Sequence, residues 1–212
     1  GKRGIMNKII FATTNTGKIK EIKEILSDCD VEVISMKEMN ITTDIEENGT
    51  TFEENSLIKA REISKLTGLP ALADDSGLCV DALEGLPGVY SARFAGEEKN
   101  DAANNAKLLS ELGGLKGKER AAHFTCCLVL AAPFQESLVV QAECHGEIAT
   151  LPSGDSGFGY DPLFLVPEYQ KTFAELGMDI KNKISHRAKA IELLVEKWEQ
   201  WTNSLGAVEE TE

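Results

Sequence analysis

A loop rich in hydroxyl groups follows the first apolar run of the chain. Residues 9–12 are apolar, and the loop that follows them consists of Thr13, Thr14, Asn15, Thr16, Gly17 and Lys18. Apolar residues then recur at helical spacing between positions 19 and 26. The start of a helix binds anions through its free N–H groups and its dipole, and Lys18 adds a positive charge there. The loop indicates a phosphate site or a simple helix cap, because Thr and Asn are also common N-caps. It is not a Walker A loop.

Two adjacent acids, Asp74 and Asp75, follow the apolar residues 71–73 and precede Ser76 and Gly77. Ligands commonly bind where the strands of α/β sheets end. Neighbouring residues of a strand point to opposite faces, so the two carboxylates are expected to do different jobs. The apolar residues 78–80 would partly bury them, which is costly unless a cation pairs with them. The alternative is a turn with solvated acids.

Several cationic side chains are candidates for contacts with an anionic ligand. Lys59 lies four residues after Asn55 and therefore on the same helical face, although an exposed lysine is the ordinary alternative. Lys181, His186 and Arg187 crowd the start of the last predicted helix, which Ser185 caps. Cations at the start of a helix interact unfavourably with its dipole, at a cost of about 0.3–1 kcal/mol each. Their presence despite this cost suggests that they bind a ligand. Pairing with surface acids is the alternative.

These cations and a nearby aromatic turn suggest how a nucleobase would be bound. In the turn, Phe158 is flanked by Gly157 and Gly159 and followed by Tyr160 and Asp161. Glycines let a ligand approach the backbone closely, and an exposed Phe stacks on bases. The alternative is an ordinary aromatic turn. Lys and Arg only donate hydrogen bonds, so a pocket lined by them favours a 6-oxo purine over adenine.

The elements that must position these groups alternate along most of the chain. Hydrophobic periodicity predicts strands over residues 9–13, 31–35, 71–74, 122–131 and 138–147, and helices over residues 17–28, 52–67, 102–112 and 186–205. The expected fold is α/β, an elongated mixed-sheet domain of two lobes with a central cleft. It would span residues 6–205, with residues 1–5 a cloning remnant and residues 206–212 a flexible tail.

Composition limits the function. A net charge of −13 over 212 residues argues against nucleic acid and anionic membranes as partners. No apolar run reaches the length of about 18 residues that a membrane helix needs. Five cysteines without a C-x-x-C motif indicate reduced thiols in a cytoplasmic protein. With three histidines and no H-E-x-x-H motif, a transition-metal site is not expected, and Mg²⁺ on carboxylates is the natural candidate.

Taken together, the motifs resemble those of the inosine triphosphate pyrophosphatase family. Each motif is weak alone, but their order along most of the chain is specific. The matching segments are Ala12-Thr13-Thr14-Asn15-Thr16-Gly17-Lys18, Phe52-Glu53-Glu54-Asn55 with Lys59-Ala60, Ala73-Asp74-Asp75-Ser76-Gly77-Leu78, residues 85–94, residues 157–162 and Ile184-Ser185-His186-Arg187.

The resemblance implies a Mg²⁺-dependent homodimer that hydrolyses ITP, dITP and XTP to the monophosphate and pyrophosphate. It implies that the loop from Thr13 to Lys18 holds the phosphates with Lys59 and Ser76. It implies that Glu47 and Asp75 bind the metal, with Asp75 also the catalytic base; Glu46 remains an alternative to Glu47. It implies that the turn from Phe158 to Asp161 stacks on the base, with Lys181, His186 and Arg187 at its oxo edge.

Two other functions remain open at this point. A phosphomonoesterase with Asp74 or Asp75 as nucleophile would release orthophosphate and form a phospho-enzyme. A nucleotide sensor without activity would bind ITP and leave it intact. The family resemblance instead implies that water attacks the α-phosphorus and that pyrophosphate leaves.

Overall fold

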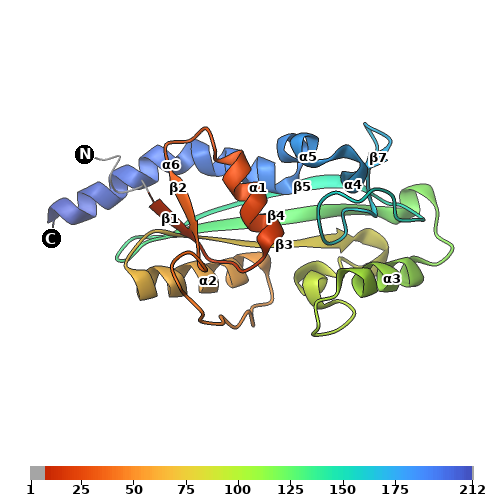
Figure 1. Ribbon diagram of the computed structural model, residues 1–212, viewed down its shortest axis with the longest axis horizontal. Coiled ribbons are helices and arrows are strands. Elements are labelled where there is room, and N and C mark those ends of the chain that lie inside the picture. Colours follow the sequence, from red (N-terminus) through yellow and green to blue (C-terminus); the bar gives the residue numbers. More distant parts are fainter. Residues whose placement is uncertain (1–7, 212) are drawn as a thin grey trace. The chain divides into compact units, whose positions relative to one another are not determined.

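The computed structural model describes residues 8–211, and the side chains of residues 8–204. In this part of the chain, strands and helices alternate and form a mixed sheet with the order β2-β1-β3-β4-β5-β6-β7 (Figure 1). The strands are β1 (Lys8–Phe11), β2 (Glu32–Ser35), β3 (Ala71–Val80), β4 (Ala121–Ala131), β5 (Leu138–Ile148), β6 (Phe164–Val166) and β7 (Lys171–Thr172). The helices are α1 (Thr16–Ile25), α2 (Phe52–Thr67), α3 (Asp101–Leu112), α4 (Phe173–Leu176), α5 (Met178–Ile184) and α6 (His186–Thr211).

Both directions of strand pairing occur in the sheet. β1 pairs in parallel with β2 and with β3, as strand–helix–strand units require. β6 pairs antiparallel with β5 and with β7. The predicted mixed α/β class is therefore confirmed. None of the helices in the described residues is long and apolar enough to cross a membrane.

The chain divides into two compact units. The first comprises the described parts of Gly1–Asp75, Cys126–Ala142 and Lys189–Glu212, and the second comprises Ser76–Thr125 and Glu143–Ala188. The boundaries fall inside β3, β4, β5 and the first turn of α6, so each of these elements contributes residues to both units.

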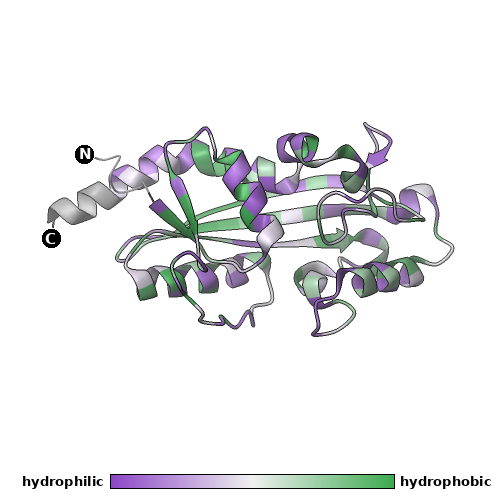
Figure 2. Ribbon diagram, in the orientation of Figure 1, coloured by the Kyte–Doolittle hydropathy of each residue, from purple (hydrophilic) through white to green (hydrophobic). Residues whose placement is uncertain are grey.

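The first unit is a sheet with helices on both faces. Alternate strand residues point to opposite faces, which gives two apolar clusters. Phe11, Leu72 and Leu128 pack with residues of α1 and α6. Ile10, Ala73 and Val129 pack with residues of α2. Figure 1 shows α2 and α6 on opposite sides of the strands, and in Figure 2 α2 carries both hydrophobic and hydrophilic residues along its length, as expected for a helix with one buried face.

The second unit has its own core, which is rich in aromatic rings. Leu78 and Val80 of β3 pack in one cluster with Leu108 and Leu112 of α3. Phe124, Phe164 and Phe173 belong to the same cluster, with ring centroids 4.6–5.8 Å apart. Such aromatic pairs add to the stability that apolar burial provides.

Most predicted elements are confirmed to within a few residues. The bounds of α2 match the prediction, because Thr51 accepts a hydrogen bond from Glu54 N and Gly68 ends the helix in the left-handed conformation. The sequence missed β6, β7, α4 and α5, which are short and lack a clear period. Residues 1–5 lie outside the described residues, and α6 continues to Thr211; the flexibility of residues 206–212 stays a prediction.

One predicted strand end is wrong. We expected a strand over residues 71–74 followed by a turn at Ser76 and Gly77, whereas β3 runs unbroken from Ala71 to Val80. The apolar residues Leu78 and Val80 keep the segment in the sheet, because both are fully buried in the core of the second unit. Asp74 and Asp75 therefore lie in the middle of a strand, and the alternative of a turn with solvated acids is excluded.

Candidate active site

The threonine-rich loop caps α1 and leaves the start of the helix open to a ligand. Asn15 is the N-cap, and its Oδ1 accepts a hydrogen bond from Lys18 N at 3.1 Å. Thr13 Oγ1 accepts a hydrogen bond from Asn15 N at 3.1 Å. Asn15 thus has the ordinary capping role that we kept as an alternative. The N–H groups of Thr16 and Gly17 have no preceding helical carbonyl to bind, so capping and phosphate binding are compatible here.

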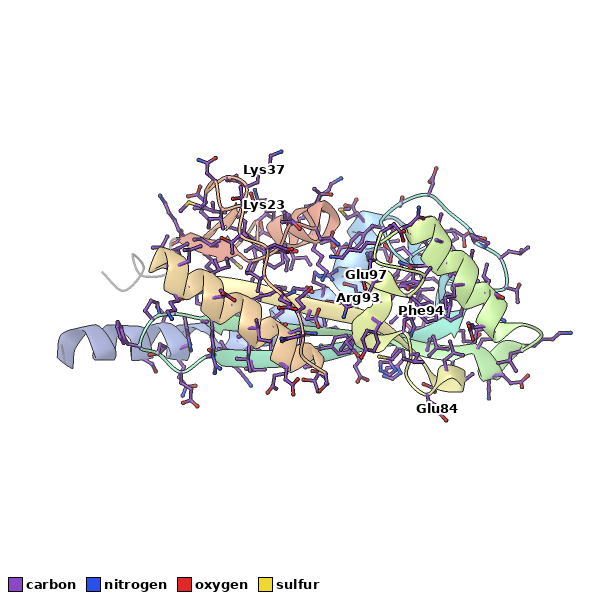
Figure 3. The ribbon with its side chains drawn as sticks, turned by 90° about the horizontal axis from the view of Figure 1, so that it is seen from below. Lys23, Lys37, Glu84, Arg93, Phe94 and Glu97 are labelled. Atoms are coloured by element: carbon purple, nitrogen blue, oxygen red, sulfur yellow. The ribbon has the colours of Figure 1, made fainter. Side chains whose placement is uncertain are left out.

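A groove of about 870 Å³ lies beside this loop, within the first unit. Thr13, Thr14 and Thr16 line it on one side. Lys23 of α1 and Lys37 of the segment after β2 also line it, and both are labelled in Figure 3. The loop therefore borders a groove whose lining carries charges of both signs, because Glu24 and Glu38 also line it and Lys23 Nζ lies 2.6 Å from Glu38 Oε1. The lining residues include neither Glu47 nor Asp75.

Asp74 braces the loop against the sheet. Its fully buried carboxylate lies 3.1 Å from Lys18 Nζ through Oδ1, and Cys126 Sγ donates to Oδ2 at 3.3 Å. The ion pair fixes the first turn of α1 on β3. Asp74 and Asp75 point to opposite sides of the strand, as predicted, and their environments differ.

Lys59 is the centre of a charged cluster on the other face of β3. Its Nζ lies 2.7 Å from Glu47 Oε1 and 3.9 Å from Asp75 Oδ1, and it donates to the backbone carbonyl of Asp74 at 2.6 Å. Only 7% of Lys59 is exposed, so the alternative of an ordinary surface lysine is wrong. The helical period of α2 turns this position towards the sheet, where the two carboxylates neutralise it. Glu46 is exposed, so of the two glutamates Glu47 is the one that reaches this cluster.

Burial dominates the protonation of Asp75. Desolvation raises the pKa of this carboxyl from 3.8 to about 6, and the Glu47 carboxylate raises it further, while Lys59, Lys18 and Asn55 act in the opposite direction. With a pKa of about 6, Asp75 is mostly ionised at neutral pH. Burying the charged form of this carboxylate costs free energy, and binding of a further cation beside it would lower that cost.

This pKa predicts that the metal-free protein loses stability as the pH rises from about 4 to 6. A carboxyl whose pKa is raised in the folded state binds its proton more tightly there, so the folded state is favoured below pH 3.8 and loses this contribution as the pH passes through 6. The difference of about two pKa units corresponds to about 3 kcal/mol. Asp75→Asn should therefore be more stable than the wild type at pH 7.5 in chelator, by up to about this amount, with no difference near pH 4.

Urea unfolding of both proteins at the two pH values measures this effect. Glu46→Gln is the control, because it removes an exposed charge from the same region. If the wild type and Asp75→Asn were equally stable at pH 7.5, the prediction would be wrong. The groups around Asp75 would then compensate fully for the burial of its charge.

Two residues to which the sequence assigned no role, Asn55 and Gly49, hold this cluster together. Asn55 Nδ2 donates to Asp75 Oδ2 at 3.2 Å, and Asn55 Oδ1 accepts from Gly49 N at 2.8 Å. Asn55 thus ties the segment that carries Glu47 to β3. A Cβ on Gly49 would lie 2.7 Å from Asn55 Oδ1 and from Glu54 Cβ, so the close approach requires glycine. The signals in the sequence were the four-residue spacing from Asn55 to Lys59 and the place of Asn55 in the segment Phe52-Glu53-Glu54-Asn55 that carries the family resemblance.

The second unit holds a cation-and-aromatic cluster. Lys181 Nζ lies 2.7 Å from Asp161 Oδ2, and both residues are almost fully buried. The same ammonium lies 4.7 Å from the centre of the Phe158 ring, and the Arg187 guanidinium lies 5.9 Å from it. Both cations are thus positioned by the aromatic turn. The acid that pairs with Lys181 is therefore a buried one, and not the surface acid that the alternative assumed.

Three more residues predicted to bind the base, Arg187, His186 and Tyr160, contact other parts of the second unit. Arg187 Nη2 donates to Ser76 Oγ at 3.1 Å, and the His186 ring stacks on Phe124 with centroids 4.6 Å apart. The Tyr160 hydroxyl donates to the carbonyl of Ser91 at 2.6 Å, and burial raises its pKa. The side chain of Tyr160 therefore supports the turn.

Residues of α3, which the sequence did not indicate, hold the tip of this turn. Asp101 Oδ2 accepts a hydrogen bond from Gly159 N at 2.9 Å, and Asn105 Nδ2 donates to the carbonyl of Gly159 at 3.1 Å. Gly157 has φ +78°, and a Cβ there would collide with the Asp161 carboxylate. No sequence spacing connects α3 with a turn more than fifty residues later, so only the fold reveals these contacts.

The predicted residues thus form two groups. Lys18, Glu47, Lys59, Asp74 and Asp75 gather in the first unit. Ser76, Phe158, Asp161, Lys181 and Arg187 gather in the second. Asp75 and Ser76 are consecutive residues of β3, so the strand connects the groups covalently. One common cleft for both groups stays a prediction.

A family model matches nearly the whole chain. The Ham1 family model covers residues 9–197. The chain belongs to the Ham1 family. Its match includes every segment that contributes to the two groups above, from the loop before α1 to the start of α6.

Relatives and solved structures agree with this assignment. The Ham1-family chain is 49% identical over 204 residues to a protein of Geobacillus kaustophilus named dITP/XTP pyrophosphatase, covering 96% of this chain and all of that one. It is 50% identical to the dITP/XTP pyrophosphatase of Bacillus subtilis, covering 90% of this chain and 96% of that one. The structure of the Staphylococcus aureus Ham1 protein aligns with a TM-score of 0.80 at 44% identity, covering 91% of this chain and 98% of that one. The resemblance inferred from the motifs is confirmed.

Proposed function

We propose that this protein hydrolyses the non-standard purine nucleoside triphosphates ITP, dITP and XTP to the monophosphate and pyrophosphate. Its relatives are named for activity on dITP and XTP. The observation that carries the proposal is the cluster around Lys59, where an ammonium group holds two carboxylates from separate segments. Binders without activity rarely retain such buried charge, because desolvation makes it costly.

The Glu47 and Asp75 carboxylates fit a magnesium ion. Mg²⁺ binds through one or two carboxylates and the phosphates of its substrate, and keeps several waters. Each carboxylate has lone pairs beyond those used by Lys59 and Asn55. Glu47 and Asp75 would hold the ion. When bound, it neutralises charge that develops on the phosphates.

Asp75 and the cations around the phosphate loop act in the attack of water on the α-phosphorus. Asp75 accepts a hydrogen bond from a water molecule and takes its proton as the water oxygen bonds to the α-phosphorus. The bond from the α-phosphorus to the bridging oxygen breaks, and pyrophosphate leaves with the electron pair. The loop before α1, Lys18 and Lys59 bind the negative charge of the phosphates.

The second group suits a 6-oxo purine. Lys181 and Arg187 present only hydrogen-bond donors, and an amino group at position 6 would face them without an acceptor. The Phe158 ring lies among these cations and offers a face for stacking. Homodimerisation and a cytoplasmic location stay predictions of the family resemblance.

A panel of nucleoside triphosphates with Mg²⁺ tests the proposed function. Pyrophosphate and monophosphate should accumulate from ITP, dITP and XTP, and slowly from ATP. Release of orthophosphate with a trapped phospho-enzyme would favour the phosphomonoesterase instead. Saturable ITP binding without product would favour the sensor.

Arg187→Ala should lower kcat/KM for ITP by about ten- to a hundredfold, because a hydrogen bond to a charged group contributes about 1.5–3 kcal/mol. The already slow reaction with ATP should change much less. Steady-state kinetics with both substrates give the ratio. Because Arg187 is almost fully buried, Arg187→Lys is the matched variant that keeps the charge and tests for a folding defect. Equal losses on ITP and ATP would assign Arg187 to the phosphates or to folding.

A further inference from the structure

Two of the three histidines of the chain meet in the second unit, and neither has been assigned a role above. His123 of β4 and His145 of β5 have ring centroids 5.1 Å apart, with 35° between the ring planes. Glu143, two residues before His145 on the same strand face, lies between them. Its Oε2 is 3.0 Å from His145 Nε2, and its Oε1 is 3.8 Å from His123 Nε2.

We infer that His123, Glu143 and His145 form a binding site for one divalent transition-metal ion, with Zn²⁺ as the best-suited probe. Two imidazole nitrogens and a carboxylate oxygen are ligands that Zn²⁺ takes in sites with one open position for water. Mg²⁺ is excluded here, because it prefers oxygen ligands throughout.

The distances fit such an ion. Bonds of about 2.0–2.2 Å in a tetrahedral arrangement place the ligand atoms about 3.3–3.6 Å apart. The two observed separations lie on either side of this range, and one ligand atom of each residue lies within 4.8 Å of the others. The side chains of Glu143 and His145 are 42% and 71% exposed, so small rotations bring the three atoms together at little cost.

The sheet makes the site rigid enough to bind an ion. β4 and β5 are consecutive in the chain and neighbours in the sheet, so the ligands come from two hydrogen-bonded strands. A bound ion would cross-link them. The sequence did not lead us to expect a transition-metal site, because the H-E-x-x-H motif places both histidines on one helix, whereas only the pairing of the strands brings these ligands together.

The thiol of Cys79 lies near enough to Glu143 to be affected by its carboxylate. Burial raises the pKa of Cys79 on β3, Thr125 lowers it, and the Glu143 and Asp81 carboxylates raise it further. Cys79 is outside the group whose ligand atoms lie within 4.8 Å of one another. The site is therefore formed by two nitrogens and one oxygen, without sulfur.

Zinc titration of the protein without a histidine tag, with Mg²⁺ in excess, tests the inference. Long-range proton–nitrogen NMR spectra resolve the rings of three histidines. Zn²⁺ should shift the signals of His123 and His145 until one ion per chain is bound, while His186 is an internal control and stays unchanged. Shifts at His186 alone, or at no histidine, would overturn the inference.

Matched variants measure the affinity by calorimetry. His145→Ala and Glu143→Gln should each weaken Zn²⁺ binding at least about tenfold, since even the loss of an outer partner of a metal ligand costs that much. Glu147→Gln makes the same change further along β5 and should bind like the wild type, as should Cys79→Ser. Zn²⁺ should raise the melting temperature of the wild type and not that of His145→Ala. Unchanged binding by His145→Ala, or its loss in Cys79→Ser, would show that the ion binds elsewhere.

Discussion

Asp75→Asn is expected to lower the turnover of ITP by about 10² or more while leaving most of the nucleotide binding intact. The amide cannot take a proton from water, and it is a weaker metal ligand than a carboxylate. The change is nearly isosteric, and Asn55 still has an oxygen at this position to which its Nδ2 donates. Binding of ITP depends on the loop before α1, Lys18 and Lys59, which the substitution does not remove.

Single-turnover kinetics with Mg²⁺, together with ITP binding by calorimetry, separate these two effects. Glu47→Gln and Glu46→Gln form a matched pair on neighbouring residues, and only Glu47 contacts the Lys59 ammonium. Glu47→Gln should lower activity, whereas Glu46→Gln should not. Unchanged turnover in Asp75→Asn would remove Asp75 from the chemistry, and equal effects of the two glutamate variants would remove Glu47 from the site.

Lys181→Met should lower the free energy of unfolding by about 3–5 kcal/mol. Lys181 Nζ and Asp161 Oδ2 lie 2.7 Å apart, and each side chain is less than 5% exposed. Removal of the ammonium leaves the Asp161 carboxylate buried without this cation, although Phe158 N still donates a hydrogen bond to it. An uncompensated buried charge of this kind costs more than the lost attraction itself.

Urea denaturation measures this loss, and two further variants identify its cause. Asp161→Asn combined with Lys181→Met removes both charges and should recover part of the stability. Lys23→Met breaks the exposed pair with Glu38, whose atoms are also close at 2.6 Å, and should change stability little. If Lys181→Met were no more destabilising than Lys23→Met, the buried pair would not be what holds the aromatic turn.

The local pattern of the sequence was sufficient to predict most helices and strands, and to predict that Asp74 and Asp75 have different roles. Thr51 and Gly68 mark the ends of α2, because capping depends on residues next to each other in the chain. The period of two along a strand separates Asp74, which pairs with Lys18, from Asp75, which faces Asn55 and Lys59. The ordered motifs were also sufficient to identify the family.

Only the tertiary structure decided which side chains are buried and what they contact. Lys59 is an ordinary helical lysine by composition, and it is buried because α2 packs against the strand that carries two carboxylates. β3 continues through Ser76 and Gly77 because residues beyond them enter a second core. Contacts such as Asp101 with Gly159, or His123 with Glu143, join residues far apart in the chain. The physical reason is that capping and periodicity act between near neighbours, whereas burial and charge pairing depend on which segments the folded sheet brings together.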